Sequence, residues 1–134
     1  MQGKSGLPIF VGVMAFGVKA VIDKAAGNVS EGDVWIFNDP YDGGTHLSDF
    51  RLVKPVMRGG KVFCWLASVG HWHDVGGNVP GNYNPAATEC FQEGMLIPPV
   101  KLFDKGEYKQ DVVCLLYTSP SPRDLSTSRM PSSA

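Results

Sequence analysis

The chain has 134 residues, of which 43% are hydrophobic and 19% charged, and its formal net charge is -1. This composition is typical of a folded soluble domain rather than of a disordered chain. The near-zero net charge gives no electrostatic indication of binding to nucleic acid or anionic lipid. The apolar stretch 7–18 contains Gly12 and Gly17 and is too short to span a bilayer. We therefore expect neither a nucleic acid nor a membrane as a partner.

The first predicted element is a helix over residues 11–26, followed by glycine and asparagine, which commonly end helices. A short strand rich in β-formers follows at 33–37 and ends at a turn sequence, Asn-Asp-Pro. Two further strands, 50–57 and 61–69, flank Arg-Gly-Gly and predict a β-hairpin. Pro55 lacks a backbone donor, so it places its strand at an edge or a bulge.

The downstream part is less regular. Residues 85–94 begin with proline and end with glycine, which favours a short helix, and 96–103 continue as an extended segment. No linker or repeat divides the chain. The sequence therefore predicts an α+β fold, with a mixed or antiparallel sheet and flanking helices. The three cysteines show no metal-binding spacing, which favours free thiols in the cytoplasm.

The C-terminal segment 114–134 differs in composition from everything before it. It is rich in serine, proline and threonine and contains no glycine, as a disordered polar tail would be. Its first part, CLLYTSPSPRD, resembles one reading frame of a transposase-type sequencing adapter containing CTCTTATACACATCT. The final SRMPSSA resembles the flanking primer sequence in the same frame. We expect the native sequence to end near Val113 and residues 114–134 to be a non-native, disordered translation of the adapter.

The first group of chemically capable side chains lies in the loop NDPYDGGTHLSD, residues 38–49, between two predicted strands. Loops held by rigid elements often carry functional sites. His46 and Asp49 are three residues apart, so a curled loop turns an imidazole and a carboxylate toward one point. Asp39 and Asp42 precede proline and glycine, where acidic side chains commonly stabilise turns through backbone hydrogen bonds.

The second group lies in GHWHDVGGNVPG, residues 70–81, after the second strand of the hairpin. It contains His71, His73 and Asp74, so all three histidines of the chain occur in these two loops. The hairpin returns one loop toward the other. Imidazole and carboxylate together suit Zn, Mn or Fe. On an extended segment both histidines point the same way. If the chain turns between them, one is free to orient a ligand together with Asp74.

A third group is best explained without chemistry. Glu89 and Glu93 share a face of the predicted helix 85–94 and are expected to be solvated. Cys90 has no histidine at a spacing that indicates a nucleophile. The chain contains neither a phosphate-binding loop nor a dinucleotide-binding fingerprint, so any nucleotide is expected to bind another polypeptide.

Three blocks of this sequence resemble a known family. GDVWIFNDPYDGGTHLSDFRLVKPV, ASVGHWHDVGGNVPG and ATECFQEGMLIPPVKLF are similar to the signature blocks of the hydantoinase B/oxoprolinase family. The resemblance covers residues 7–113. It implies a fragment of a larger, B-type subunit that works with an A-type, ATP-binding subunit in a cytoplasmic complex. Family members include subunits of N-methylhydantoinase, 5-oxoprolinase and acetone carboxylase.

The resemblance also implies a site. Zinc or manganese is expected on His46, Asp49 and His71, with a further acidic ligand upstream of Met1, while His73 and Asp74 would lie around the ligands. The implied reaction is ATP-dependent hydrolysis of a cyclic amide such as a hydantoin or 5-oxoproline. One alternative is a subunit of an ATP-dependent ketone carboxylase. Another, of a different class, is a non-catalytic scaffold for the A-type subunit.

Overall fold

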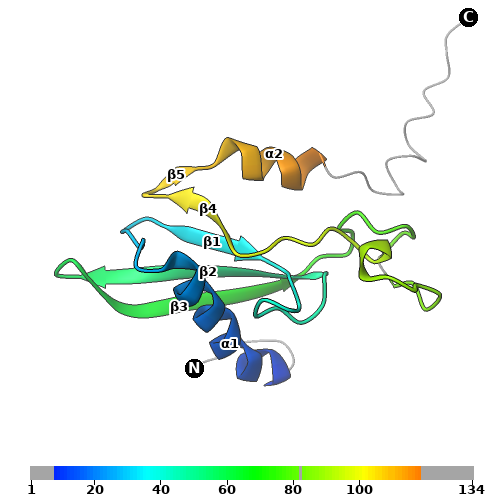
Figure 1. Cartoon of the computed structure of the whole chain (residues 1–134), viewed down its shortest axis with the longest axis horizontal. Coiled ribbons are helices and arrows are strands. Elements are labelled where there is room, and N and C mark those ends of the chain that lie inside the picture. The colour runs from blue at the N-terminus through cyan, green and yellow to red at the C-terminus, as the bar shows by residue number, and fades with distance from the viewer. Residues whose placement is uncertain (1–7, 82, 119–134) are drawn as a thin grey trace, which may run out of the picture.

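A five-stranded antiparallel sheet in the order β3-β2-β1-β4-β5 forms the centre of the molecule (Figure 1). The computed structural model describes residues 8–81 and 83–118. Its strands are β1 (Val34–Phe37), β2 (Asp49–Arg58), β3 (Lys61–His71), β4 (Val100–Asp104) and β5 (Glu107–Tyr108). The helices are α1 (Pro8–Ala25) and α2 (Gln110–Thr118), with one 3₁₀ turn at Cys90–Gln92. The fold is therefore α+β, as the sequence predicts.

Helix α1 covers one face of β2 and β3 (Figure 1). Its C-terminal half buries Val21 and Ala25 against Trp35, Phe37 and Val53. Alternate residues of a strand point to the same face, so the odd-numbered positions of β1 and β2 form this side of the core. The helix ends at Ala25, followed by Gly27 at φ 86°, a left-handed conformation that suits glycine. Neither described helix is long and apolar enough to cross a membrane.

The opposite face of the sheet carries a second apolar cluster. Ile36 and Phe50, at even-numbered positions of β1 and β2, pack with Leu47, Val75 and Ile97 from the connecting loops. Helix α2 lies on this side, next to β4 (Figure 1). The sheet therefore lies between α1 on one face and the connecting loops and α2 on the other.

The predicted hairpin is formed by β2 and β3. Pro55 is buried in β2, which has β1 as its second neighbour only from Arg51 to Val53. The proline therefore lies where β2 is paired on one side, and a register shift follows directly after Val56. This agrees with a proline at a local edge, next to a bulge.

Two expectations for the C-terminal half are wrong. The helix expected over 85–94 is reduced to the 3₁₀ turn at Cys90–Gln92, where Gln92 accepts hydrogen bonds from the backbone of Thr88 and Glu89. Glu89 and Glu93 are exposed, as expected, but they share no helix face. Disorder from residue 114 onward is wrong as far as Thr118, because α2 includes these residues. Residues 119–134 lie outside the described part of the chain, and the non-native origin of 114–134 stays a prediction.

An ion pair between the partly buried Lys101 and the buried Asp33 holds the β4–β5 hairpin to the start of β1. Asp33 is fully buried and accepts hydrogen bonds from the backbone of Ser30 and Lys105. Lys101 Nζ lies 3.0 Å from both Asp33 Oδ2 and Asp104 Oδ1. Burial lowers the pKa of Lys101, but its two carboxylate partners outweigh burial, so the pKa is raised above its ordinary value. The sequence analysis did not predict this pair.

Candidate metal centre

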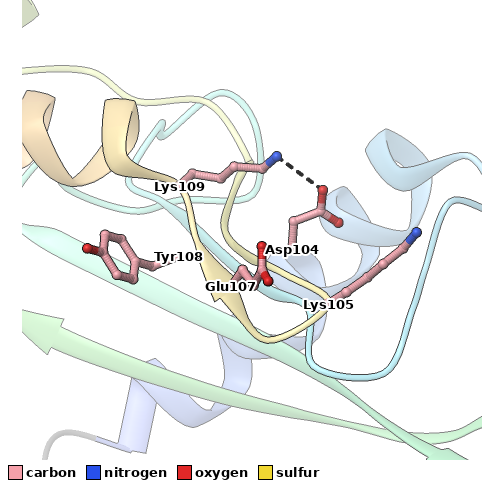
Figure 2. A pocket seen from close by; sticks show the side chains of 5 residues that line it. All are labelled: Asp104, Lys105, Glu107, Tyr108 and Lys109. Carbon is pink, nitrogen blue, oxygen red and sulfur yellow. Dashed lines mark ion pairs between the residues drawn. The ribbon is translucent and has the colours of Figure 1, made fainter.

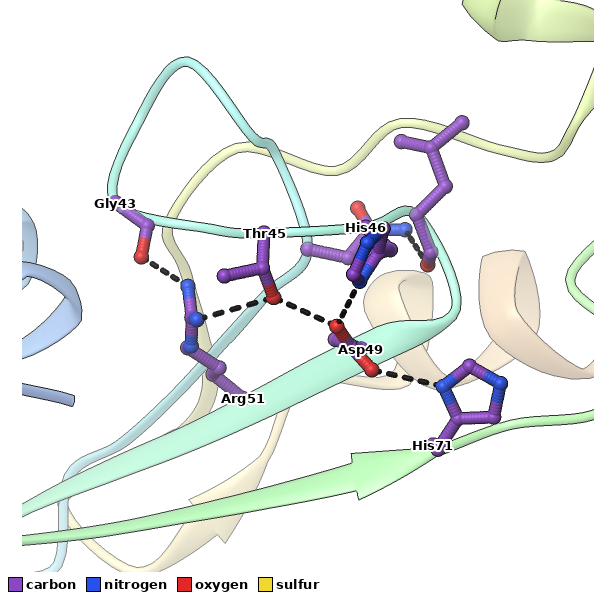
Figure 3. A network of polar contacts seen from close by, with 8 residues as sticks. Gly43, Thr45, His46, Asp49, Arg51 and His71 are labelled. Atoms are coloured by element: carbon purple, nitrogen blue, oxygen red, sulfur yellow. Dashed lines mark hydrogen bonds and ion pairs between the residues drawn. The ribbon is translucent and has the colours of Figure 1, made fainter. Parts of the chain in front are cut away.

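The carboxylate of Asp49 lies between two imidazoles (Figure 3). Its Oδ2 atom is 2.7 Å from His46 Nδ1, and its Oδ1 atom is 2.8 Å from His71 Nδ1. Asp49 is fully buried, whereas the side chains of His46 and His71 are 74% and 61% exposed. Two of the residues expected to ligate a metal, His46 and His71, thus both contact the third, the buried Asp49, from the surface.

Two separate pieces of backbone geometry bring these residues together. Asp49 and His71 lie opposite each other in the β2–β3 register, because the hairpin returns the chain to the start of β2. His46 is placed by a turn, in which the backbone N–H of Asp49 donates to the carbonyl of His46 at 2.9 Å. The sequence analysis expected both the returning hairpin and the curled loop.

The surroundings of Asp49 keep its carboxyl group ionised. Burial by itself raises the pKa of Asp49. Hydrogen bonds from Thr45, His71 and His46, together with the charge of His46, outweigh burial, so the pKa lies below its ordinary value. A buried carboxylate with its charge retained is a strong acceptor for several donors, or for a cation, at the same point.

Asn38 anchors the loop that carries His46. Its buried side-chain amide donates to the carbonyls of Leu47 and Met95, both at 2.7 Å. Its side-chain oxygen accepts from the backbone N–H of Ile97, also at 2.7 Å. One side chain at the end of β1 therefore ties the residue next to His46 to the segment 95–97.

The glycine pair in this loop allows a close path of the backbone. Asp39 Oδ1 accepts from the backbone N–H of Tyr41, and the carbonyl of Asp39 accepts from Gly44. A Cβ atom on Gly44 would lie 2.3 Å from that carbonyl oxygen, so only glycine fits. Asp39 thus stabilises a turn, as expected. Asp42 contributes a backbone hydrogen bond to the same carbonyl.

The remaining residues of the second loop lie beside the triad. Strand β3 ends at His71. The alternation of side-chain direction along a strand, which would point His71 and His73 the same way, therefore does not extend to His73. The ring of His73 stands perpendicular to that of His71, with centroids 6.5 Å apart. Trp72 stacks on Phe50 at 4.1 Å, which is a packing role. Asp74 Oδ1 accepts from the backbone N–H of Gly76 at 3.4 Å.

Two polar residues at the site were missed by the sequence analysis. Thr45 Oγ1 donates to Asp49 Oδ2 at 2.6 Å, and the guanidinium of Arg51 contacts Thr45 and the carbonyl of Gly43 (Figure 3). A signal was present for Arg51, since residues two apart on a strand point to the same face. Thr45 precedes His46 directly, and only the structure shows that its hydroxyl turns toward Asp49.

The donor set suits a first-row divalent metal, because two imidazoles and one carboxylate supply nitrogen and oxygen ligands. Within residues 8–81 and 83–118, no three His, Cys, Asp or Glu side chains are arranged so that they could bind one metal ion. The reason lies in the contacts described above: the imidazoles use Nδ1 to bind the carboxylate itself. Binding one ion with all three residues requires these two hydrogen bonds to give way. Metal ligation by His46, Asp49 and His71 stays a prediction.

A hollow lies at the β4–β5 hairpin, at the edge of the sheet opposite β3 (Figure 2). It has a volume of about 370 Å³ and is lined by Asp104, Lys105, Glu107, Tyr108 and Lys109. Lys109 Nζ pairs with Asp104 Oδ2 at 3.1 Å. The hollow is open, and its two acidic and two basic side chains balance in charge. Its lining contains no histidine, unlike the site at Asp49.

Comparison with known proteins agrees with the sequence blocks. The family model described as hydantoinase B/oxoprolinase matches residues 1–134. The chain belongs to this family. It is 40% identical over 123 residues to caprolactamase subunit beta of Pseudomonas jessenii, and 34% identical over 125 residues to 5-oxoprolinase 1 of Arabidopsis thaliana. These alignments cover 92% and 93% of the chain, but 21% and 10% of the relatives.

Solved structures of the family show the same fold. The crystal structure of the ATP-dependent caprolactamase from Pseudomonas jessenii superposes with a TM-score of 0.80 at 40% identity, over 87% of this chain and 20% of that one. The nucleotide-free structure of acetone carboxylase superposes with a TM-score of 0.74 at 25% identity, over 84% of this chain and 15% of that one. The chain thus spans about a fifth or less of these relatives, one of which, caprolactamase subunit beta, is itself a subunit of a larger enzyme.

Proposed function

We propose that the chain supplies the metal-ligating residues of a B-type subunit in an ATP-dependent cyclic amidohydrolase, with His46, Asp49 and His71 as ligands. The observation that supports this most directly is the buried Asp49 carboxylate, held between two exposed imidazoles that come from different elements. A single structural histidine needs one partner. Two histidines converging on one ionised acid are typical of a site for a cation.

Each residue has a distinct part in this proposal. His46 and His71 offer neutral nitrogen donors from the solvent side, where a small substrate has access. Asp49 supplies the negative charge, and its burial keeps water away from that charge. Zinc or manganese bound here would polarise a carbonyl or phosphoryl oxygen and lower the pKa of a water molecule. In this proposal His73, whose ring is perpendicular to that of His71, orients a ligand or relays a proton.

The need for ATP follows from the stability of the amide bond. Transfer of the γ-phosphoryl group of ATP to the amide oxygen, by an A-type partner subunit, would make the carbonyl carbon more electrophilic. Attack of water on this carbon at the B-type site would then break the C–N bond and leave an acyl phosphate, which a second water molecule would hydrolyse to a carboxylate and phosphate. The sequence contains no phosphate-binding loop, which supports placing ATP on the partner. Hydantoins and 5-oxoproline are the proposed substrate class, and the cytoplasm the proposed location, in keeping with free Cys64, Cys90 and Cys114.

A ketone carboxylase subunit is the second candidate. It is supported by the TM-score of 0.74 with acetone carboxylase, and by 29% identity over 115 residues with the delta subunit of an acetophenone carboxylase from Aromatoleum aromaticum. The higher identity of 40% to a lactam-hydrolysing relative favours the amidohydrolase. Turnover assays of the assembled complex with a cyclic amide, and separately with a ketone and bicarbonate, distinguish the two.

The test of the metal site uses His46→Ala and His71→Ala in the assembled complex, with His73→Ala as a matched control from the same loop. Metal content by plasma mass spectrometry and ATP-dependent ring opening are both measured. We expect the first two variants to lose the metal and product formation. His73→Ala should keep the metal, because the two imidazoles that contact Asp49 are those of His46 and His71. Wild-type protein without stoichiometric metal would support the scaffold alternative instead. Metal and turnover retained in both ligand variants would refute the assignment.

A further inference from the structure

The guanidinium of Arg51 is fully buried two residues after Asp49, on the same face of β2. It donates to the carbonyl of Gly43 and, at 3.2 Å, to Thr45 Oγ1. Helix α1 makes room for it at Gly17, where an added Cβ atom would lie 3.1 Å from Arg51 Cδ. Burying a charged group is costly unless it is paired. The loop that carries Gly43 and Thr45 is therefore held by a buried cation, which fits beside α1 because residue 17 is glycine.

The contact with Arg51 fixes the direction of the Thr45 hydroxyl proton. A guanidinium has only donors, so Thr45 Oγ1 must accept from it, and the hydroxyl has one proton left to give. That proton goes to Asp49 Oδ2 at 2.6 Å. The result is a directed chain of hydrogen bonds from Arg51 through Thr45 to the carboxylate (Figure 3).

The hydrogen bonds from Arg51 through Thr45 to Asp49 differ from the two imidazole contacts in whether metal binding would break them. The hydrogen bonds from His46 and His71 are the ones that must give way if all three residues bind one ion. The bond from Thr45 involves no proposed ligand other than Asp49, so it can persist in the metal-free and the metal-bound protein. Outer contacts of this kind orient the ligands of metal sites and raise metal affinity.

We propose that Thr45 and Arg51 are positioning residues for Asp49: Arg51 orients the Thr45 hydroxyl, which in turn holds the carboxylate plane toward His46 and His71. The proposal rests on the proposed function, since it assigns these residues a role in a metal site. Neither residue contacts the metal or the substrate. Their effect is on the geometry and affinity of the site, and it extends the site beyond the two histidines and the aspartate.

The test is a titration of the assembled complex, freed of metal, with Co²⁺, followed by visible absorption, which reports affinity and ligand geometry together. Thr45→Val keeps the shape of the side chain and removes the hydroxyl, and Thr45→Ala is a second variant without the hydroxyl. Thr45→Ser keeps the hydroxyl as the matched control. We expect both hydroxyl-free variants to lose about 10- to 100-fold in Co²⁺ affinity and to show a changed spectrum. Thr45→Ser should remain close to wild type.

The outcomes separate this proposal from the one on which it rests. If wild-type protein binds no Co²⁺, the proposed metal site fails and this inference with it. If wild-type protein binds Co²⁺ and a folded hydroxyl-free variant does so with the same affinity and spectrum, the positioning role alone is overturned. The same holds if Thr45→Ser loses as much affinity as Thr45→Val, because a general disturbance of the loop would then explain both. Circular dichroism of each metal-free variant establishes that it is folded.

Discussion

Replacement of Asn38 by alanine should destabilise the protein more than most single substitutions. The side chain makes three buried or partly buried hydrogen bonds of 2.7 Å, to the carbonyls of Leu47 and Met95 and from the N–H of Ile97. Each such bond contributes about 1 kcal/mol net, and a buried group left without a partner costs about 1–3 kcal/mol. The expected loss is therefore about 3–5 kcal/mol. A domain has about 5–15 kcal/mol in total, so this loss is a large share.

Urea denaturation followed by tryptophan fluorescence measures this loss. The matched control is Asn84→Ala, which removes an asparagine whose two side-chain hydrogen bonds, to Asn78 and from Ala86, are exposed. Water replaces exposed partners, so the control should lose about 0.5 kcal/mol or less. Equal losses in the two variants would refute the reasoning, because burial would then not decide the contribution of these bonds. The slope of the unfolding free energy against urea concentration should be the same in both variants as in wild type, which would show that all three expose the same surface on unfolding.

Two further predictions concern helix α1 and Lys101. Gly12→Ala should stabilise the protein by about 0.5–1 kcal/mol, because an added Cβ meets nothing within 4 Å. Gly17→Ala should lack this gain, since the same atom lies 3.1 Å from two core side chains; thermal unfolding of both variants checks this, and equal gains would contradict it. The pKa of Lys101 is raised in the folded state despite burial, by Asp33 and Asp104. Its contribution to stability is thus complete below its ordinary pKa of 10.5 and is lost as the pH rises through the folded value. Urea midpoints measured across this range should fall more steeply for wild type than for Lys101→Met, and parallel curves would contradict the assignment.

The sequence was sufficient for the parts of the fold whose signals are local. The hairpin of β2 and β3 follows from two β-rich runs around Arg-Gly-Gly, and α1 follows from its helix formers. The meeting of His46, Asp49 and His71 also follows from local signals, since a hairpin aligns its ends and a three-residue spacing curls a loop. These predictions depend on few residues that lie close together in the chain.

The parts that could not be predicted depend on contacts between distant segments. Residues 85–94 have helix-like ends, but Met95 is held by Val75 and Asn38, which draws the chain into an extended path. Helix α2 has an apolar face whose Val112 and Leu116 pack on the second cluster. Helical spacing alone gave too weak a signal for it in a segment rich in polar residues. The pairing of Asp33 with Lys101 spans a large part of the sequence and has no local signature.

The proposed site divides into two parts with different supports. Asp49 and His71 are fixed by the register of the β2–β3 hairpin, whose pairing extends along both strands. His46 instead depends on the loop before β2, which Asn38 holds at Leu47 and Arg51 holds at Gly43. A disturbance of the loop should therefore displace His46 and leave the pair of Asp49 and His71 in place. Such a protein retains two of the three proposed ligands, so it should bind a divalent metal more weakly while the hairpin remains folded.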